Sequence, residues 1–536
     1  MGWQKYPLFR LLLPFVAGMI IADATAALLT QNITILFISL CLCAIALFMQ
    51  NGRKSRDSFY PKFGIAAMLF FFIFGAALYT LSFNDIRTSL SPDTRQGIVV
   101  KNPERKARSW ALTMRTDAGA RFTAYIDDKS DSTAITGIQI GDTLTFSTRS
   151  FSPTCPLDLN EQEQDFAPFR RHLFCSGISA TCYIRHDCWS VTPTSASSPN
   201  LFTRLRTAMS EAYRNADFTS EEGALIEALT IGDKSRLPQQ LKTDYSRAGI
   251  SHVLALSGFH LAVIFTLLNM MLFAIALPYR WQWIKSLIII ATLWTFTLLA
   301  GSPPSLVRAA VMCSLMSIGG CFGRPVLSIN SLTLAAFLML GFNPLLLHDV
   351  GFQLSYISVL AICTLAVPCN RKCQEHLYEQ FHSKSAFTKA SMHILEYFSG
   401  IAIVSLVCTL ATAPLVAYHF HTIPLLSVLS VLANLLVCLL ASVLLYAVAL
   451  WWILFWWNGA RLLLTEVLET IARLMNTVAE WISSVSWATL NWSPSKIQVL
   501  LSYALIVSIA TYLYRRTATS LKLTLIILVV LLATFL

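Results

Sequence analysis

The stretch SHVLALSGFHLAV, residues 251–263, places two histidines and a serine at the start of a long apolar run. Imidazole and hydroxyl groups donate, accept and exchange protons, and they are rare on helices that face lipid. On a straight helix at about 100° per residue, His252, Ser257 and His260 fall within an arc of roughly 140°, and Gly258 is a candidate for breaking the helix. A polar or broken segment at membrane depth is tolerated only where it faces protein or water. We therefore predict that these residues line an internal path.

Two later apolar segments also carry polar groups. In GSPPSLVRAAVM, Arg308 lies just inside a span, and in HDVGFQLSYISVLA the residues Asp349, Gln353 and Tyr356 share one helix face. An ionised residue near the bilayer centre costs about 2.5–3.5 kcal/mol on insertion scales, so such groups are kept for a pathway, a site or a buried pair. The structural alternative is that Arg308 and Asp349 neutralise each other and the histidines bond to nearby carbonyls. Three polar faces this close together favour a hydrated path. The predicted lining residues are His252, Ser257, Gly258, His260, Arg308, Asp349, Gln353 and Tyr356.

A hydrolase is a competing interpretation of the same residues. Ser257 would be the nucleophile, His260 the base and Asp349 the group that orients it. The serine and histidine are three residues apart, but no G-x-S-x-G surrounds the serine. We therefore predict no enzymatic activity, no catalytic residue and no cofactor.

The composition predicts a polytopic α-helical membrane protein. Of 536 residues, 55% are hydrophobic and 13% are charged, against roughly 25% charged in ordinary globular domains. Apolar runs long enough to cross a bilayer recur along the chain. Their predicted bounds are 8–29, 33–49, 63–83, 250–277, 284–300, 305–321, 326–342, 350–369, 398–417, 424–455, 497–514 and 520–536, with 460–490 amphipathic. Basic residues in the loops NGRKSRDSFYPK and 370–389 place those loops and the N-terminus in the cytoplasm, and residues 84–249 outside.

The outer segment has a different pattern, which predicts an inserted domain. SWALTMRT (109–116), RFTAYID (121–127), GDTLTFST (141–148) and ISATCYI (178–184) alternate as half-buried strands do. Several short strands in this length suggest a small β-barrel of the oligonucleotide-binding type. Helical patterns follow Pro199, with a helix start at Thr219 and a stop at Gly249. The predicted regions are N-terminal transmembrane helices (1–83), an extracytoplasmic β-barrel-like domain (84–198), an amphipathic helical linker (199–249), a membrane domain (250–455) and a C-terminal transmembrane region (456–536).

The barrel carries cations interleaved with aromatic residues. KNPERKARSW (101–110) is basic, and further arginine and tyrosine residues follow on the next strands. Phosphates need counter-charge and unpaired bases need flat surfaces, so this pattern suits single-stranded nucleic acid, although a solvated loop with ordinary strand aromatics would look similar. The candidate DNA-binding residues are Lys101, Arg105, Lys106, Arg108, Trp110, Arg121 and Tyr125, with Arg115 beside them.

Four cysteines lie in the same outer segment. In an oxidising compartment they would form one or two disulfides, with three alternative pairings, and the other interpretation is four buried thiols. The candidates are Cys155, Cys175, Cys182 and Cys188.

Several longer stretches resemble the ComEC competence-protein family, whose members take up DNA in natural transformation. ISHVLALSGFHLAVI looks like the family signature. The resemblance extends through ALTIGDKSRLPQQLKTDYSRAG, SPPSLVRAAVM, NPLLLHDVGFQLSYISVLAI and LVCTLATAPLVAYHFHTIPLLSVLSVLANLL, and DFAPFRRHLFCSGISAT resembles the end of the family's small barrel. It covers about residues 60 to 450. It implies a competence membrane domain over 250–455 and a channel in the bacterial inner membrane that passes single-stranded DNA into the cytoplasm.

One departure from the family concerns the C-terminal end. Many members end in a metallo-β-lactamase-like domain with H-x-H-x-D-H, whereas here His419 and His421 give only H-x-H, so we expect a short form with no metal site. Any degradation of the second strand would then need a separate nuclease. LTIGDKS (229–235) is not a P-loop, so a cytoplasmic helicase or strand-binding protein would supply the force. Membrane lipids and further copies of the chain complete the expected partners. The alternative function is a proton-coupled secondary transporter of a small anionic solute.

Overall fold

In the computed structural model the chain forms two compact units. The first consists of Met1–Leu205 and Ile329–Phe352, and the second of Arg206–Ser328 and Gln353–Leu536. The structure describes residues 7–25, 56–88, 94–101, 103–106, 109–127, 135, 137–138, 140–148, 150–155, 167–185, 187–192, 201–216, 218–274, 281–321, 328–380, 386–424, 428–484 and 489–534. The predicted span 33–49 and the candidate DNA-binding residue Arg108 lie outside these ranges.

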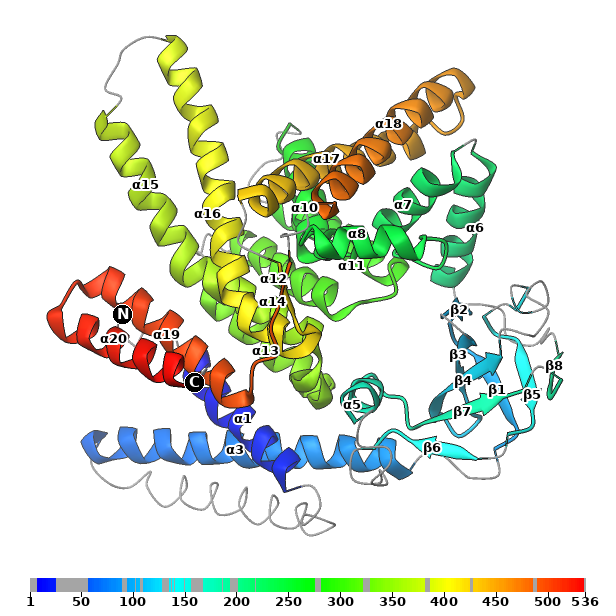
Figure 1. Cartoon of the computed structure of the whole chain (residues 1–536), viewed down its shortest axis with the longest axis horizontal. Helices are drawn as coiled ribbons and strands as arrows, with labels where there is room; N and C mark the ends of the chain where they lie inside the picture. The colour runs from blue at the N-terminus through cyan, green and yellow to red at the C-terminus, as the bar shows by residue number, and fades with distance from the viewer. Residues whose placement is uncertain are drawn as a thin grey trace. The chain divides into compact units, whose positions relative to one another are not determined.

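The first unit contains one eight-stranded sheet (Figure 1). Its strands are β1 (Gln96–Val99), β2 (Glu104–Arg105), β3 (Ser109–Arg115), β4 (Arg121–Asp127), β5 (Thr143–Phe146), β6 (Phe151–Pro153), β7 (Ala180–Ile184) and β8 (Trp189–Thr192). The four predicted strands are confirmed as β3, β4, β5 and β7. Period-2 alternation decides their faces, because every second side chain enters one core that includes Leu112, Met114 and Phe122.

The sheet is open, which corrects the predicted closed barrel. Its hydrogen-bonded order is β6-β7-β4-β3-β1-β5-β8, with β2 beside β3, and in the described structure the end strands β6 and β8 are not paired. Closure would require each end strand to present free backbone groups to the other. β6 is only three residues long and ends in Pro153, which has no N–H to donate, a composition typical of an edge strand.

Two helices of the first unit meet through glycines. They are α1 (Pro7–Ala24) and α3 (Arg56–Thr88). A Cβ atom on Gly18 would lie 1.9 Å from the carbonyl oxygen of Phe72, and one on Gly75 would lie 2.1 Å from that of Phe15. Such close backbone approach through small residues is characteristic of helices packed within membranes. Phe15 is 1% exposed, and its ring stacks on that of Phe74 with centroids 5.8 Å apart.

The amphipathic helices after residue 199 are confirmed, and they pack in the second unit against a helical hairpin. They are α6 (Leu201–Asn215), α7 (Ser220–Thr230) and α8 (Gln239–Arg247), and the hairpin is α17 (Val428–Ile453) with α18 (Asn458–Ser483), which lie side by side in Figure 1. Trp451 is fully buried and stacks on Tyr213 with ring centroids 5.7 Å apart. Helix α18 accounts for the predicted amphipathic segment 460–490, because its apolar stripe enters this core.

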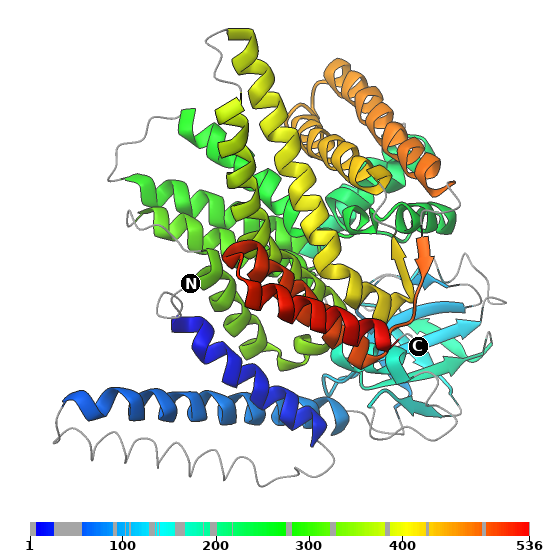
Figure 2. The same cartoon turned by 60° about the vertical axis from the view of Figure 1, so that its left-hand side comes forward.

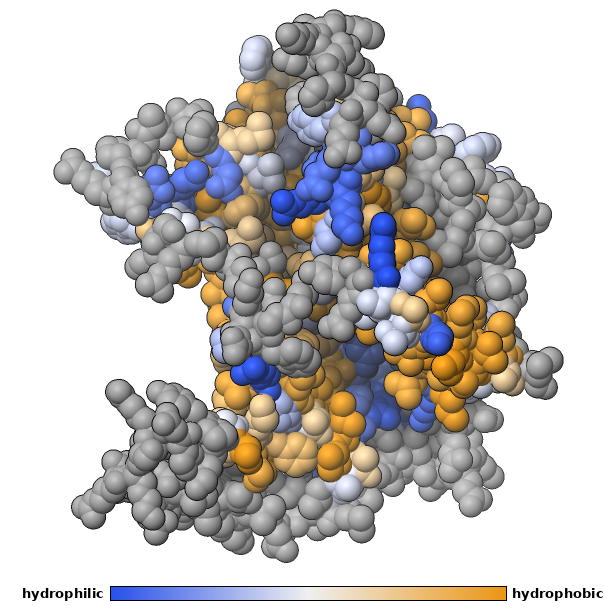
Figure 3. Space-filling view, turned by 90° about the vertical axis from the view of Figure 1, so that its left-hand side faces the viewer, coloured by the Kyte–Doolittle hydropathy of each residue, from blue (hydrophilic) through white to orange (hydrophobic). Residues whose placement is uncertain are grey.

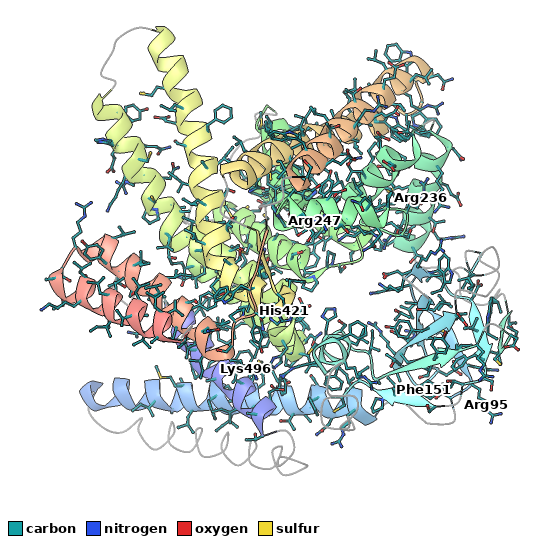
Figure 4. All side chains as sticks on the ribbon, in the orientation of Figure 1. Arg95, Phe151, Arg236, Arg247, His421 and Lys496 are labelled. Atoms are coloured by element: carbon teal, nitrogen blue, oxygen red, sulfur yellow. The ribbon has the colours of Figure 1, made fainter. Side chains whose placement is uncertain are left out.

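A buried ion pair closes the turn between α7 and α8. Glu227 is 1% exposed and lies 3.2 Å from Arg236 Nη1, and the hydroxyl of Ser210 donates to the same carboxyl group. Figure 4 labels Arg236, which precedes α8 in the sequence, and Arg247, the last residue of that helix. A buried carboxylate needs such partners, so Glu227 links α6, α7 and the turn.

The rest of the second unit consists mainly of apolar helices. They are α9 (Ser251–Leu254), α10 (Gly258–Ala274), α11 (Gln282–Leu299), α12 (Pro304–Cys321), α14 (Val350–Ala361, whose first residues belong to the first unit), the π-helical turn η6 (Ile362–Ala366), α15 (Val367–Gln380), α16 (Ala386–Phe420), α19 (Lys496–Arg515) and α20 (Ala518–Ala533). Figure 2 shows the short strands β9 (Thr422–Pro424) and β10 (Thr489–Asn491) paired beside α16.

Eight helices in the described ranges are long and apolar enough to cross a membrane. They are Pro7–Ala24, Gly64–Arg87, Gln282–Leu299, Pro304–Cys321, Val350–His376, Phe398–Phe420, Asn434–Ile453 and Lys496–Leu513. The other described spans predicted from the sequence correspond to the shorter apolar helices Gly258–Leu272, Ile329–Phe342 and Ala518–Ala533. Large hydrophobic areas are visible on the face drawn in Figure 3. The chain is therefore a multi-pass helical membrane protein.

Candidate functional site

The helix break predicted at Gly258 is present, and it is built around a serine and a histidine. Helix α9 ends at Leu254 and α10 begins at Gly258. The backbone N–H of Ser257 donates to His260 Nδ1 at 3.4 Å, and the hydroxyl oxygen of Ser257 lies 3.3 Å from the same nitrogen. This contact is one half of a capping box, with an imidazole where a glutamate usually accepts the N–H, and the N–H of His260 bonds to the backbone carbonyl of Ser257 at 3.1 Å.

The contact at Nδ1 indicates which tautomer of His260 fits its surroundings. A neutral imidazole has one donor and one acceptor nitrogen, so acceptance at Nδ1 puts the proton on Nε2. His260 is 0% exposed, and its Nε2 has no hydrogen-bond partner within the described part of the chain. The start of α10 therefore contains a buried donor that its neighbours leave unused.

Arg308 adjoins the same helix start. It lies on α12 and is 5% exposed, and its Nη2 is 3.4 Å from the point that a Cβ on Gly258 would occupy. The guanidinium carbon lies 5.5 Å from the centre of the Tyr356 ring, yet Nε and Nη1 have no hydrogen-bond partner among the described residues. A buried cation without an anionic partner is costly, because its lost hydration is not replaced.

The predicted lining residues Asp349 and Gln353 lie at the start of α14. Asp349 accepts the backbone N–H of Phe352 at 2.7 Å and so caps α14, on which Gln353 is half-buried. The alternative pairing of Asp349 with Arg308 stays a prediction, because the two residues belong to different units.

His252 belongs to a polar chain that sequence reasoning only partly found. Its Nε2 lies 3.2 Å from Asn434 Oδ1, and Asn434 Nδ2 donates to Ser405 Oγ at 2.8 Å. The chain thus links α9, α17 and α16. Asn434 is a lone amide inside a 26-residue apolar helix. That signal could have identified it, since side-chain amides in membrane helices commonly bond to other helices.

A second polar cluster, in the first unit, was not predicted. Asp23 on α1 accepts hydrogen bonds from Tyr79 OH at 2.6 Å and from the guanidinium of Arg171, and His348 Nε2 lies 3.5 Å from the same carboxylate. Arg171 belongs to α5 (Ala167–Cys175) and His348 to the 3₁₀ turn η5 (Pro344–His348). The four residues are far apart in sequence, so no spacing rule brings them together.

The charge states of Arg171 and His348 depend on burial and on the Asp23 carboxylate. Burial disfavours the charge on Arg171, but the Asp23 carboxylate outweighs that effect and raises the pKa of Arg171. Burial lowers the pKa of His348 against the attraction of Asp23, so this ring is neutral at pH 7. Asp23 and Arg171 therefore form the ion pair of the cluster, and it ties α5 to α1.

We expect Asp23→Asn to destabilise the protein by about 1–2 kcal/mol, less than a fully buried pair would lose. Arg171 keeps 42% of its side chain exposed, so water partly solvates the charge that the substitution leaves behind. The thermal midpoint of the purified chain in detergent measures the effect. Asp85→Asn removes an exposed carboxyl from α3 and should leave the midpoint unchanged. Equal midpoints for the two variants would contradict the role given to Asp23.

The basic stretch of the sheet is arranged differently from the prediction. Trp110 is 8% exposed and the guanidinium of Arg105 lies 5.9 Å from its ring centre, so Trp110 is a core residue and not a stacking platform. Lys106 lies 2.8 Å from the Glu104 carboxylate, which offsets its charge. Lys101 is exposed.

The outward face of the sheet carries a different set of aromatic and basic residues. Tyr125 on β4 is half-buried and lies beside Tyr183 on β7 in the parallel register. Tyr183 is 54% exposed and was not predicted, although its alternation with Cys182 and Ile184 in ISATCYI could have placed it outward. The exposed Arg121 is directly opposite the exposed Arg115. Two like charges in register repel, and an anion between them would relieve the repulsion.

The predicted disulfides are not formed in the structure. Cys175, Cys182 and Cys188 are free thiols, which excludes every pairing among the four candidates, and Cys155 is buried. Burial raises the pKa of Cys175 and of Cys182 to about 12 in each case. Both therefore stay protonated, and it is the thiolate that attacks a disulfide or an oxidant.

The fold and this site together define a class of protein. It is a multi-pass helical membrane protein with buried hydrogen-bond donors at a helix break, and these donors have no partner among the described residues. The family model described as Competence protein matches residues 229–516, more than half of the chain. The chain therefore belongs to the competence protein family.

One curated relative is the "ComE operon protein 3" of Bacillus subtilis (strain 168). It is 26% identical over 252 residues, which cover 46% of this chain and 29% of the relative. The matched region thus spans less than a third of that protein. No solved structure matches the chain significantly.

Proposed function

We propose that the chain is an inner-membrane channel that passes single-stranded DNA into the cytoplasm during natural competence. The observation that carries this proposal is Arg308, a buried cation whose Nε and Nη1 have no hydrogen-bond partner among the described residues, at a polar helix break inside the region that matches the family. A polyanion cannot enter hydrocarbon, and it needs donors at membrane depth that bind phosphate without trapping it. Uptake of labelled duplex DNA by cells with and without the chain tests the function. Unchanged uptake after complete deletion would reject it.

The open sheet is proposed to collect the strand as an oligonucleotide-binding-like domain. Support comes from its outward face, where Tyr125 and Tyr183 adjoin and Arg115 faces Arg121. Stacking on tyrosine needs no particular base, and arginine supplies counter-charge to phosphate. Both properties suit a strand of any sequence.

The topology and partners are part of the same proposal. The N-terminus lies in the cytoplasm and residues 84–249 lie outside the inner membrane. A cytoplasmic helicase or strand-binding protein pulls the strand, a separate nuclease removes its complement, and further copies of the chain assemble with it. The chain itself conducts and does not cleave. The contact of Ser257 with His260 is accounted for by the helix cap, without a nucleophile.

We expect Tyr183→Ala to weaken binding of a fluorescent oligothymidylate to the purified full chain. Loss of one stacking partner costs about 1–3 kcal/mol, which is roughly 5- to 150-fold in Kd. Arg121→Gln should lower the slope of log K against log salt by about one. Tyr378→Ala removes a 50% exposed tyrosine from α15 and serves as the matched control. If Tyr183→Ala and Tyr378→Ala bind equally, the sheet is not the collecting surface.

A further inference from the structure

We propose that a pocket at the turn between α17 and α18 binds the headgroup of an ethanolamine phospholipid. The proposal concerns the bilayer around the chain and does not depend on what the chain conducts. Such a headgroup carries a phosphate, whose unesterified oxygens only accept hydrogen bonds, and a primary ammonium group, which only donates them. A site for it therefore needs a cation and a carboxylate in one pocket.

The pocket has a volume of about 380 Å³ and lies between helix α6 and the α17–α18 turn. Ligand pockets in proteins begin at roughly 300 Å³, so this one accommodates a headgroup and leaves the acyl chains outside. Two aromatic rings and three polar side chains line it, those of Trp451, Phe455, Glu211, Asn215 and Arg461. The pocket thus combines an apolar wall with one cation, one carboxylate and one amide.

The three polar side chains are available to a ligand. The guanidinium carbon of Arg461 lies 5.5 Å from the centre of the Phe455 ring. Stacking uses the flat face of a guanidinium and leaves its N–H groups for an acceptor. Within the described part of the chain, the side chains of Arg461, Glu211 and Asn215 form no hydrogen bond or ion pair. A phosphate beside Arg461 and an ammonium group beside Glu211 would satisfy both charges.

The pocket lies where lipid headgroups are found. The apolar span Asn434–Ile453 ends just before Phe455. The sequence WWILFWW (451–457) concentrates aromatic residues at that end, and Trp456 and Trp457 are 91% and 68% exposed. Tryptophan is enriched at the boundary between hydrocarbon and water. The end of the span and the exposed tryptophans therefore both place the pocket at this boundary.

The polar groups of the pocket select among phospholipids. Glu211 repels a headgroup whose only charge is the phosphate, as in phosphatidylglycerol. A quaternary ammonium group, as in phosphatidylcholine, has no N–H, whereas a primary ammonium group donates to a carboxylate and to an amide oxygen such as that of Asn215. Apolar side chains exposed next to the pocket offer a surface to the acyl chains, and they are Ile453, Leu462 and Leu463.

Thermal midpoints of the purified full chain in detergent test the site. The probes are dioleoyl-phosphatidylethanolamine, dioleoyl-phosphatidylglycerol and dioleoyl-phosphatidylcholine at one mole fraction. At about ten times its Kd, the ethanolamine lipid should raise the midpoint by roughly 2 °C more than the choline lipid, since a ligand that binds only the folded state stabilises it. Arg461→Gln should lose this excess. Arg214→Gln, which removes an exposed arginine of α6 from outside the pocket lining, should retain it.

Glu211→Gln separates lipid recognition from a purely structural role. Without the carboxylate, the glycerol lipid should stabilise the variant as much as the ethanolamine lipid does, whereas the unmodified chain should distinguish the two. Glu466→Gln removes an exposed carboxylate of α18 from outside the pocket lining and should keep the distinction. If Glu211→Gln lowers every midpoint alike and leaves the differences between lipids unchanged, the proposal is wrong.

Three further results would overturn the assignment. Equal shifts with all three lipids would mean general solvation of the chain by lipid. A larger shift with the glycerol lipid than with the ethanolamine lipid in the unmodified chain would mean an anion site in which Glu211 has no part. An ethanolamine excess that persists in Arg461→Gln would place the lipid elsewhere. The proposed DNA channel is tested separately, because deletion of the chain and DNA uptake do not involve these probes.

Discussion

Arg308→Gln is expected to reduce the entry of DNA into the cytoplasm by roughly 10- to 150-fold, while the protein remains in the membrane. Glutamine keeps a polar side chain but removes the charge and the paired N–H groups that bind phosphate. A hydrogen bond to a charged group is worth about 1.5–3 kcal/mol, and one such loss along the proposed route would slow every phosphate that passes. Labelled duplex DNA, counted as nuclease-protected label inside the cell, measures the effect.

The variants that accompany this experiment identify which feature of Arg308 matters. Arg308→Lys keeps the charge but loses the planar fork, so its uptake should fall between those of the unmodified chain and Arg308→Gln. Arg371→Gln is the control, because Arg371 is 81% exposed and pairs with Glu375 on the surface of α15. His260→Ala should also lower uptake, since it removes both the helix cap and the free donor.

The outcomes lead to different conclusions. If Arg308→Gln leaves DNA bound outside and unprotected at a normal membrane level of protein, Arg308 belongs to the conducting path. Normal import by Arg308→Gln and His260→Ala would make these polar groups structural and the predicted lining residues wrong. Import that persists after deletion of the chain would make a solute transporter the better account.

The local elements of this chain could be predicted from its sequence because they depend on short-range periodicity. Alternation along 109–116 and 121–127 places residues on two faces of a strand, and long apolar runs require helices in lipid. The helix break at Gly258 was also predictable, since a polar cluster with glycine interrupts an otherwise apolar run. In each case the deciding information lies within about 20 residues.

The features that the sequence could not predict depend on contacts between residues that are far apart along the chain. Trp110 looked like a stacking surface because a strand pattern does not say which face enters the core, and the pairing of β2 with β3 brings Arg105 over its ring. Asp23 and His348 are separated by more than three hundred positions, so only the fold brings them together. Sequence reasoning found the polar residues of the membrane half and missed the partner of one of them, Asn434.

The candidate site itself was only half predictable. Arg308, His260 and Gly258 were identified as polar or breaking residues in apolar runs, but their meeting point is set by the packing of α12 against the start of α10. Ser305 on α12 donates to the carbonyl of Leu256 at 3.0 Å, which holds the two segments in register. A contact between a side chain and a backbone segment 49 residues away has no signature in spacing.

Gly18→Ala should cause the largest loss of stability among single-methyl substitutions in the described chain, at least about 3 kcal/mol. The new Cβ would lie 1.9 Å from the carbonyl oxygen of Phe72, well inside contact distance, and a backbone oxygen in a helix cannot rotate away as a side chain can. Helices α1 and α3 would have to separate. Because lipid is as apolar as the side chains, no hydrophobic force restores the pair once close packing is lost.

Gly64→Ala is the matched control for this substitution. Gly64 lies on α3, and a Cβ there meets no atom within 4 Å, so alanine should leave the thermal midpoint unchanged or raise it slightly through its better helix propensity. The midpoint in detergent and the amount of protein recovered from membranes measure both variants. A Gly18→Ala protein as stable and abundant as Gly64→Ala would show that α1 and α3 tolerate separation at this point. A loss confined to Gly18→Ala would show that two glycines, and not the surrounding phenylalanines, determine how the first helices of this chain assemble.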